Sequence, residues 1–342
     1  MKKSKKVVIG LSGGVDSSVA AFLLKRKGFS VTGVFMRFWS EKEENRCCSS
    51  KGEERARKIA ERLDIPFYVV NLSDRFKKRV VDPFLTDLKK GDTPNPCTIC
   101  NREVKFKSLF ESLITCGADY VATGHYARIK EEAANNKLLK GKDKRKDQSY
   151  FLWNLKREWL SKILFPLGEN EKEKVREIAK KENLPTANTE ESQEICFVSD
   201  KMNSFLERNI GRSPGEITDV AGNILGEHKG LFYHTIGQRK GLNLPGGPYY
   251  VLEKERDKNR LIVTESKKDL LKREVSFKKE NFLQDVSFPL KVRAKIRYNG
   301  KESSALLKEN KAVFSSPLEA VTPGQSIVFY RGEEVVGGGV IE

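Results

Sequence analysis

The sequence Gly10-Leu-Ser-Gly-Gly-Val-Asp-Ser-Ser18 places three glycines, three serines and one aspartate within nine residues. It follows a short apolar run, Val7–Ile9, which predicts a buried strand. Apolar residues then recur at helical spacing as far as Gly28, so the segment is expected to join a strand to a helix. Gly13 and Gly14 would let the backbone approach a phosphate, and the serine hydroxyls and a helix N-terminus would hold it. The segment therefore predicts a phosphate-binding turn.

This turn differs from the common nucleotide loops. It lacks the Gly-Lys-Ser/Thr ending of a Walker loop and the G-x-G-x-x-G spacing of a dinucleotide fold. Ser-Gly-Gly-x-Asp-Ser instead resembles the pyrophosphate loop of the enzymes that split ATP into AMP and pyrophosphate. That resemblance implies that the loop binds ATP and that Asp16 helps to hold Mg²⁺, a hard cation that prefers oxygen ligands. The alternative is a serine-capped helix start after a tight turn.

Composition limits the class of protein. The chain has 342 residues, enough for two or three domains, and 38% apolar residues with no run of membrane-spanning length. The N-terminus, Met1-Lys-Lys-Ser-Lys-Lys6, has no signal-peptide core, so we expect a cytoplasmic protein with no membrane partner. A formal charge of +17 and a pI near 9.5 favour a polyanionic partner such as nucleic acid, although a merely solvated basic surface fits too.

Residues 6–130 alternate strand-like and helix-like segments. Strands are expected at 30–38, 67–71 and 120–123, and helices at 52–63, 76–89 and 106–116. This order predicts a doubly wound parallel α/β sheet, in which ligands bind at the carboxyl ends of the strands. Met36 is near one such end and Gly124-His125 follows another. Met36 could line an adenine pocket or belong to the core, and His125 could contact a phosphate or substrate or simply be exposed.

The second half of the chain has a different pattern. A charged helix is expected at 169–182, and from Met202 onward the sequence predicts a small mixed domain. From about Leu270 the strands are short and alternating, and Asn299-Gly300 is a strong hairpin signal, so a small β-barrel or sandwich is expected at the end. We therefore divide the chain into domains at residues 1–200, 201–268 and 269–342.

A lysine-rich segment, Lys140-Gly-Lys-Asp-Lys-Arg-Lys-Asp147, is expected to be an exposed basic loop. The residues after it, Gln148-Ser-Tyr-Phe-Leu-Trp153, become apolar and aromatic. Basic residues beside aromatic rings suit a nucleic-acid surface, because the rings stack on bases. A flexible loop that leads into a core segment fits the same pattern, and the sequence does not decide between the two.

Six cysteines in a long chain of this kind favour catalysis or metal binding over a disulfide framework. Cys97 and Cys100 form a C-x-x-C pair, expected in a rigid, proline-rich loop, which could be a redox couple, half of a metal site, or structural. The neighbouring pair Cys47-Cys48 could complete a zinc site, but adjacent cysteines chelate poorly. Cys116 falls on an apolar helix face and is expected in the core.

Several motifs occur together in one order along the chain. They are the Ser-Gly-Gly-Val-Asp-Ser loop, Thr-Pro-Asn-Pro-x-x-x-Cys-Asn, Gly-His-Tyr-Ala, Lys-Asp-Gln-Ser-Tyr-Phe-Leu, Ser-Gln-Glu-Ile-Cys-Phe, Thr-Ile-Gly-Gln-Arg-Lys-Gly and a Pro-Gly-Gln near the end. The joint set covers essentially the whole chain and resembles the tRNA-specific 2-thiouridylases. The resemblance implies an adenylating N-terminal domain of the adenine nucleotide alpha hydrolase type, a small central domain and a C-terminal β-barrel, which together hold the anticodon arm of a tRNA.

Carried over by position, the resemblance implies a set of site residues. Cys100 matches the nucleophile of the family and Cys196 its persulfide carrier. The implied ATP contacts are Gly10, Leu11, Ser12, Gly13, Gly14, Val15, Asp16, Ser17, Met36 and Gly124. The implied tRNA contacts are His125, Lys146, Asp147, Gln148, Arg297, Tyr298 and Gln325.

The implied reaction installs sulfur at C2 of the wobble uridine. Transfer of AMP to the C2 oxygen would create a leaving group, while the loop and Mg²⁺ would offset the charge on pyrophosphate. A persulfide on Cys196, supplied by a sulfur donor protein, would attack C2 of a base flipped out of the anticodon stack. Cys100 would release the sulfur and leave a Cys100–Cys196 disulfide to be reduced. Apart from the resemblance, Cys196 could equally be a small buried hydrophobic residue.

One position departs from the family pattern. Many members have an acidic residue, thought to handle protons, where this chain has Cys97. Cys97, Cys100 and Cys196 could instead bind three irons of a 4Fe–4S cluster, because soft thiolates suit iron–sulfur centres. The fourth iron could then carry the sulfide that is delivered. The sequence leaves the cluster route and the persulfide route equally open.

Two other functions would keep part of this pattern. One is a ligase that forms an amide or thiolates a small molecule, and the other is an RNA-binding protein with a vestigial nucleotide loop. The basic charge, the predicted barrel and the pair Cys100 and Cys196 count against the ligase. The intact Asp16 and the three cysteines count against the vestigial loop.

Overall fold

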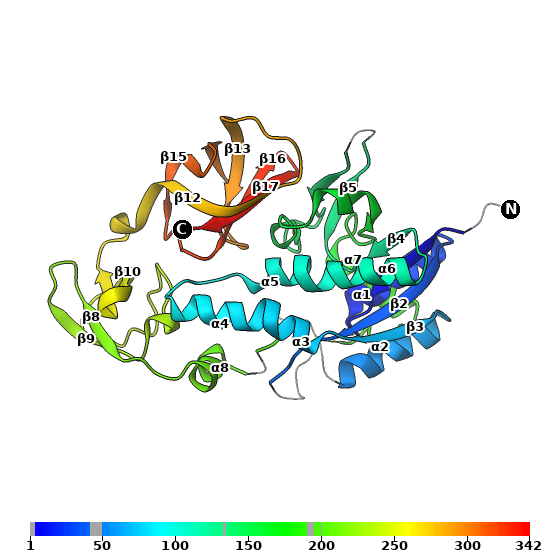
Figure 1. Cartoon of the computed structure of the whole chain (residues 1–342), viewed down its shortest axis with the longest axis horizontal. Coiled ribbons are helices and arrows are strands. Elements are labelled where there is room, and N and C mark those ends of the chain that lie inside the picture. Colours follow the sequence, from blue (N-terminus) through cyan, green and yellow to red (C-terminus); the bar gives the residue numbers. More distant parts are fainter. Residues whose placement is uncertain (1–3, 42–49, 133–134, 190–194, 199) are drawn as a thin grey trace.

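The protein was analysed as a computed structural model, which describes residues 4–41, 50–132, 135–189, 195–198 and 200–342. Its N-terminal domain contains a parallel sheet with the strand order β3-β2-β1-β4-β7 (Figure 1). The strands of this sheet are β1 (Lys6–Gly10), β2 (Ser30–Arg37), β3 (Phe67–Asn71), β4 (Tyr120–Ala122) and β7 (Ile163–Leu164). The predicted doubly wound α/β sheet is therefore confirmed.

Helices cover both faces of the sheet. Side chains alternate along a strand, so neighbouring residues of β1 pack against helices on opposite faces. Val7 and Ile9 of β1 pack in one apolar cluster with α1, α2 and α7, whereas Val8 packs in another cluster with α6. The helices and helical turns of this domain are α1 (Val15–Arg26), α2 (Ser50–Arg62), α3 (Ser73–Phe76), η1 (Lys77–Val81), α4 (Asp82–Lys89), α5 (Pro96–Ile99), η2 (Cys100–Phe106), α6 (Lys107–Thr115), η3 (Ser149–Phe151), η4 (Arg157–Lys162) and α7 (Lys172–Lys181).

Two long helical rods run through the middle of the molecule, α3–η1–α4 and α5–η2–α6 (Figure 1). Both contain a π-helical turn, η1 or η2, of the kind that often marks a functional site. The expected proline-rich loop around the C-x-x-C pair is therefore wrong. Pro96 occupies the first turn of α5, where its missing N–H is tolerated, and Asn95 Oδ1 accepts a hydrogen bond from Cys97 N.

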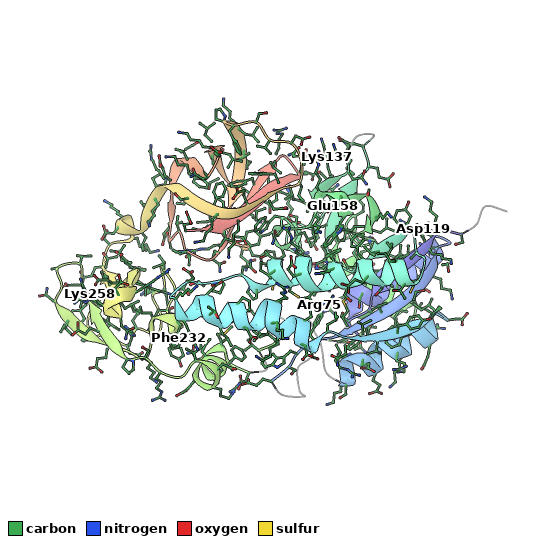
Figure 2. All side chains as sticks on the ribbon, in the orientation of Figure 1. Arg75, Asp119, Lys137, Glu158, Phe232 and Lys258 are labelled. Carbon is green, nitrogen blue, oxygen red and sulfur yellow. The ribbon has the colours of Figure 1, made fainter. Side chains whose placement is uncertain are left out.

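The central domain is a small mixed sheet with the strand order β10-β11-β8-β9 and its own apolar core. Phe232 joins it to the N-terminal domain, because this buried ring belongs to the same apolar cluster as Phe84 of α4 (Figure 2). No helix in the described ranges is long and apolar enough to cross a membrane. The elements are α8 (Met202–Asn209), β8 (Gly215–Thr218), β9 (Ile224–His228), η5 (Leu231–Tyr233), β10 (Tyr250–Glu255), η6 (Arg256–Lys258) and β11 (Arg260–Thr264).

The C-terminal domain is a closed barrel and not a sandwich. Its first long strand, β12, pairs with both β15 and β17, which closes the order β12-β15-β14-β13-β16-β17 into a ring. Asn299-Gly300 lies between the antiparallel strands β13 and β14, as its hairpin signal predicts. The elements are η7 (Lys267–Leu270), β12 (Leu271–Phe282), β13 (Leu290–Lys295), β14 (Ser303–Leu307), β15 (Lys311–Glu319), β16 (Ser326–Arg331) and β17 (Glu334–Ile341).

A hairpin from the N-terminal domain, β5 (Ala127–Lys130) and β6 (Lys137–Lys140), extends this barrel beside β17. Ion pairs join the two domains here, Arg128 with Glu333 at 2.8 Å and Lys140 with Glu302 at 2.6 Å. The sequence did not predict this hairpin, and Lys140 is strand rather than exposed loop.

The aromatic segment after the lysines belongs to the core. Tyr150 and Trp153 are each 1% exposed. They pack with Leu138 of the hairpin and with Val328 and Tyr330 of the barrel in one apolar cluster. Of the two interpretations of Gln148–Trp153, the core segment is therefore correct for these two rings.

The shared cluster predicts how strongly the barrel depends on the hairpin. Leu138 is 0% exposed in β6, whereas its neighbour Leu139 points to the other face and is half-buried. Leu138→Ala should lower the free energy of unfolding by about 2–5 kcal/mol, because it leaves a cavity between two domains. Leu139→Ala is the matched control and should cost much less. Chemical denaturation would measure both, and equal losses would contradict the shared core.

Candidate nucleotide and thiol site

The glycine-rich turn joins the end of β1 to the start of α1. Gly13 has a φ of +72°, and a Cβ there would collide with the carbonyl oxygen of Gly52. The N-cap of α1 is Gly14, which has no side chain to accept a hydrogen bond from the first N–H groups of the helix. Ser17 Oγ and Ser18 Oγ instead donate to Gly14 O. The alternative of a serine-capped helix start is therefore wrong, and the helix start is suited to an anion.

Asp16, in the first turn of α1, has two hydrogen-bond donors on one oxygen. The hydroxyl of Tyr126 donates to Asp16 Oδ1 at 2.8 Å, and Lys172 Nζ donates to the same atom at 2.6 Å. The Asp16 side chain is 35% exposed, whereas that of Lys172 is 6% exposed. A half-exposed carboxylate beside a helix start is a suitable ligand for Mg²⁺, so Asp16 fits the cation that the family resemblance implies, and Mg²⁺ binding stays a prediction.

Sequence reasoning missed both partners of Asp16. Tyr126 belongs to the Gly-His-Tyr-Ala motif, which could have indicated that this residue lies in the site. Lys172 gave none, because it is one of many lysines in a charged helix.

Gly124 lies directly against the start of α1. A Cβ on Gly124 would come within 2.8 Å of the backbone C of Asp16 and the backbone N of Ser17. Such a distance is shorter than real contacts, so only glycine fits without a backbone shift. The structure thus brings Gly124 and the glycine-rich turn together, as the predicted carboxyl edge of the sheet requires.

Met36 connects this turn with the cysteines. A Cβ on Gly10 would lie 3.2 Å from Met36 Cε, so the methionine lies beside the end of β1. Met36 is half-buried and packs against two apolar clusters, one of which also contains Cys100. The core contact of Met36 is therefore present, and its contact with adenine stays a prediction.

Cys100 and Cys196 contribute to the same apolar cluster although they are far apart in the sequence. Cys100 is buried at 4% exposure in an apolar cluster, and Cys196 packs against the same cluster. Burial raises the pKa of the Cys100 thiol to about 11, against a smaller opposing effect of Lys105, and burial also raises the pKa of Cys97. The resting site therefore keeps Cys97 and Cys100 protonated at neutral pH.

Cys116 does not belong to this cluster. Cys116 caps the far end of α6 and packs partly buried against a different cluster, so it is structural. Cys47 and Cys48 lie outside the described residues. Among the residues that the structure describes, no three His, Cys, Asp or Glu side chains gather closely enough to hold a metal. As arranged here, Cys97, Cys100 and Cys196 therefore do not fit a 4Fe–4S cluster.

His125 is half-buried rather than exposed. Its Nδ1 is 2.7 Å from Thr123 Oγ1, and its ring stacks against Phe106 and meets the edge of Phe165. Burial, with a smaller effect of Lys105, lowers the pKa of His125 to about 3. The imidazole is therefore neutral at physiological pH, so it can act only as a neutral hydrogen-bonding or stacking group.

The predicted tRNA contacts at 146–148 belong to an ordered loop. Asp147 is buried at 6% exposure and accepts hydrogen bonds from Gly141 N and Ser149 N. Gln148 Oε1 accepts from Tyr126 N, which ties the loop to a partner of Asp16. Lys142 and Lys144 project from this loop and are exposed.

The remaining predicted contacts lie on the barrel. Arg297 is exposed and donates to Ala320 O, and the half-buried ring of Tyr298 lies 4.5 Å from that of Phe151. Gln325 Nε2 donates to Thr93 O at 2.7 Å, and Thr93 N donates to Pro323 O.

Residues 91–93 are therefore held by hydrogen bonds and an ion pair from both the central domain and the barrel. While the barrel holds Thr93, the central domain holds the two residues before it, because Lys254 Nζ donates to Gly91 O and Arg256 pairs with Asp92. Residues of all three domains thus fix the segment just before the helix that carries Cys97 and Cys100.

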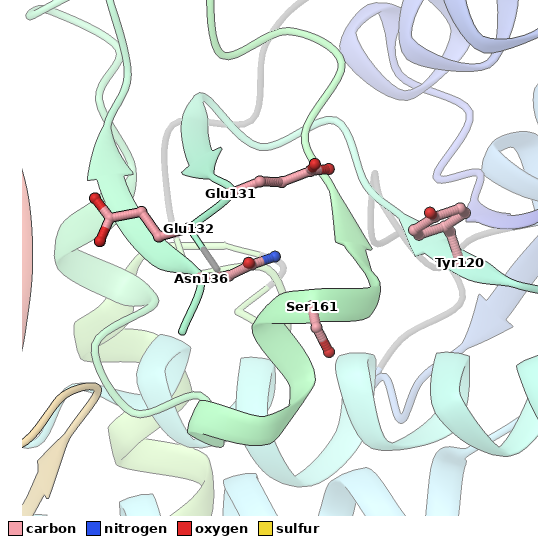
Figure 3. A pocket seen from close by; sticks show the side chains of 5 residues that line it. All are labelled: Tyr120, Glu131, Glu132, Asn136 and Ser161. Carbon is pink, nitrogen blue, oxygen red and sulfur yellow. The ribbon is translucent and has the colours of Figure 1, made fainter. Parts of the chain in front are cut away.

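A separate pocket of about 430 Å³ is lined by Tyr120, Glu131, Glu132, Asn136 and Ser161 (Figure 3). Tyr120 begins β4, whereas Gly124 follows its end, so this pocket lies at the opposite edge of the sheet. The carboxylates of Glu131 and Glu132 point in opposite directions, and Glu132 is paired with Lys130 and Lys137. The pocket is therefore not part of the candidate site.

The fold and this site define a class: α/β proteins that bind a nucleotide at a pyrophosphate loop and carry a thiol pair and a barrel. Three family models match the chain in order. They are the tRNA methyl transferase HUP domain over residues 5–200, the tRNA methyl transferase PRC-barrel domain over 203–265 and the aminomethyltransferase beta-barrel domain over 272–341.

Curated relatives narrow the class further. The tRNA-specific 2-thiouridylase MnmA of Carboxydothermus hydrogenoformans is 44% identical over 99% of this chain and 98% of its own. MnmA 1 of Caldanaerobacter subterraneus subsp. tengcongensis is 46% identical over 100% of this chain and 99% of its own. The chain therefore belongs to the tRNA-specific 2-thiouridylase family.

Solved structures give weaker similarity. The U34-tRNA thiolase NcsA of Methanococcus maripaludis, solved with its 4Fe–4S cluster, is 23% identical with a TM-score of 0.38. The match covers 61% of this chain and 68% of that one. A similarity of this size supports no argument about the chemistry of this chain.

The raised pKa of Cys100 predicts how its reactivity depends on pH. Since only the thiolate reacts, alkylation of Cys100 by iodoacetamide should rise about tenfold per pH unit. The rise should continue past the ordinary thiol pKa of 9.0 toward about 11. Lys105→Met should slow the reaction at a given pH, while Lys107→Met, an exposed neighbour, should not. Peptide mass spectrometry would follow the rate, and a plateau at or below pH 9.0 would contradict the assignment.

Proposed function

We propose that this chain uses ATP to thiolate C2 of the wobble uridine in tRNA. The observation that carries the proposal is that Cys100 and Cys196 belong to one apolar cluster, which Met36 links to the glycine-rich turn. An activating site and a sulfur-transfer site would then act on the same carbon. The family relatives named as tRNA-specific 2-thiouridylases support the same reaction.

The first step activates the base. The C2 oxygen forms a bond to the α-phosphorus of ATP as the bond to the bridging oxygen breaks, and pyrophosphate leaves. The N–H groups at the start of α1 would stabilise the developing charge. Mg²⁺, held in part by Asp16, would supply further positive charge at the phosphates. The adenylated oxygen can then depart as AMP.

The second step transfers sulfur. The terminal sulfur of a persulfide on Cys196 bonds to C2, and AMP leaves with the electrons of the C–O bond. The Cys100 thiolate then attacks Sγ of Cys196, and the electrons of the broken S–S bond go to the sulfur on C2. This gives the 2-thiouridine and a Cys100–Cys196 disulfide, which an external thiol must reduce. A donor protein would restore the persulfide.

The cysteine roles can be tested by mass spectrometry of tRNA incubated with protein, ATP, Mg²⁺ and a persulfide source. Cys100→Ser and Cys196→Ser should each lower thiolation about a thousandfold or more, because each removes a reacting sulfur. Cys116→Ser is the matched control and should keep the wild-type rate. Cys100→Ser should keep ATP–pyrophosphate exchange in the presence of tRNA, since activation precedes sulfur transfer.

The same thiolation assay distinguishes the persulfide route from the iron–sulfur route. For the persulfide route proposed above, we expect full activity from colourless, iron-free protein. Activity that requires anaerobic purification and a visible iron–sulfur absorption band would overturn the persulfide route. Retention of thiolation by Cys100→Ser would overturn its role as nucleophile.

The loop at 141–149 is proposed to contact tRNA through its exposed lysines. Lys142→Glu with Lys144→Glu should weaken tRNA binding about tenfold at low salt and reduce the salt dependence by up to about two phosphate contacts. Because Asp143 and Asp147 hold the loop from within, these changes should leave its conformation intact. Lys180→Glu with Lys181→Glu, exposed at the far end of α7, is the control for net charge. Equal losses in both pairs, measured by filter binding, would contradict the proposal.

A further inference from the structure

Lys172 is a buried cation beside the glycine-rich turn, and none of the family motifs contains this residue. It is the first residue of α7, and its side chain is 6% exposed. Its Nζ lies 2.6 Å from Asp16 Oδ1 and 5.7 Å from the centre of the Tyr126 ring. The ammonium therefore occupies one oxygen of the carboxylate to which the proposed function assigns Mg²⁺.

The backbone holds Lys172 in this position. Lys172 N donates to Asp143 Oδ2 at 3.0 Å, and Asp143 is itself only 4% exposed. The helix that Lys172 begins packs along α1, whose start forms the turn. Burying an ammonium is unfavourable unless a charged partner compensates it, so the pair with Asp16 is a specific feature of this site and not a surface contact.

We propose that Lys172 is the resident counter-ion of Asp16 and exchanges it for the phosphates of ATP when Mg²⁺ binds. Mg²⁺ and the ammonium would compete for the negative charge of one carboxylate, so Mg²⁺ binding should weaken the contact between Asp16 and Lys172. The flexible stem of a lysine lets the ammonium turn toward a new anion, and the triphosphate at the start of α1 would be the nearest. The exchange rests on the proposed function, because it requires ATP and Mg²⁺ at this turn.

Binding of the non-hydrolysable analogue α,β-methylene-ATP would test the exchange without turnover or tRNA. Calorimetry over a series of Mg²⁺ concentrations gives two quantities: the half-saturating Mg²⁺ concentration and the analogue affinity at saturating Mg²⁺. Lys172→Met should lower the first about tenfold, because Mg²⁺ no longer displaces a cation, and should weaken the second about tenfold, because a phosphate contact is lost.

Further variants separate this exchange from a structural role. Lys172→Arg keeps the charge and binds a carboxylate more tightly, so it should raise the half-saturating Mg²⁺ concentration. This variant provides the test if Lys172→Met does not fold. Lys180→Met, exposed on the same helix, should change neither quantity. In an Asp16→Asn background, Lys172→Met should no longer change the Mg²⁺ dependence.

The outcomes keep this inference separate from the proposed function. If Lys172→Met leaves either quantity unchanged, or raises the half-saturating Mg²⁺ concentration, the exchange is wrong while the ATP site stands. If the wild-type protein binds no analogue at any Mg²⁺ concentration, the proposed function fails first and the exchange fails with it. A melting curve of each variant shows whether a loss of affinity comes from unfolding.

Discussion

The parallel pairing of β1 with β2 and β4 is the constraint on which the rest of the structure depends. Gly10 pairs with Val34, and Ile9 pairs with Ala122, so the strands end at one edge of the sheet. The loops that follow them must therefore meet. This is why Gly124 touches the start of α1 and why Tyr126, just beyond it, reaches Asp16. A shift of one residue in that register would separate the groups that form the nucleotide site.

A second level of organisation comes from contacts between domains. The central domain and the barrel both hold the residues just before the helix that carries Cys97 and Cys100, through Lys254 and Gln325. Cys196, near the end of the N-terminal domain in sequence, packs against the apolar cluster that contains Cys100. Contacts from all three domains thus hold the start of the helix that carries Cys97 and Cys100, whereas the glycine-rich turn is built within one domain. Since both outer domains contact residues 91–93, we expect a movement of either domain to reach the thiol helix by direct contact.

Local sequence signals were sufficient for the parallel sheet, the barrel and the strand–turn–helix geometry of the glycine-rich turn, because apolar periodicity and glycine spacing act over short distances. They failed where the partner is remote. The strand at Lys137–Lys140 pairs with Glu334, which lies in another domain, and its lysines suggested a loop. Prolines suggested a loop before Cys97, yet a proline in the first turn favours a helix. Lys172 had no signal, because only the tertiary fold brings it to Asp16.

The hairpin beside β17 has a consequence for the order in which the molecule assembles. Arg128 of β5 and its partner Glu333 are 205 residues apart, so the ribosome makes the hairpin long before the strand that covers it. Until that strand emerges, Leu138 and Trp153 have only part of their packing, and the nascent N-terminal domain exposes a strand edge with an apolar face. Completion of this core is thus a late event in biogenesis, because it waits for the synthesis of β17.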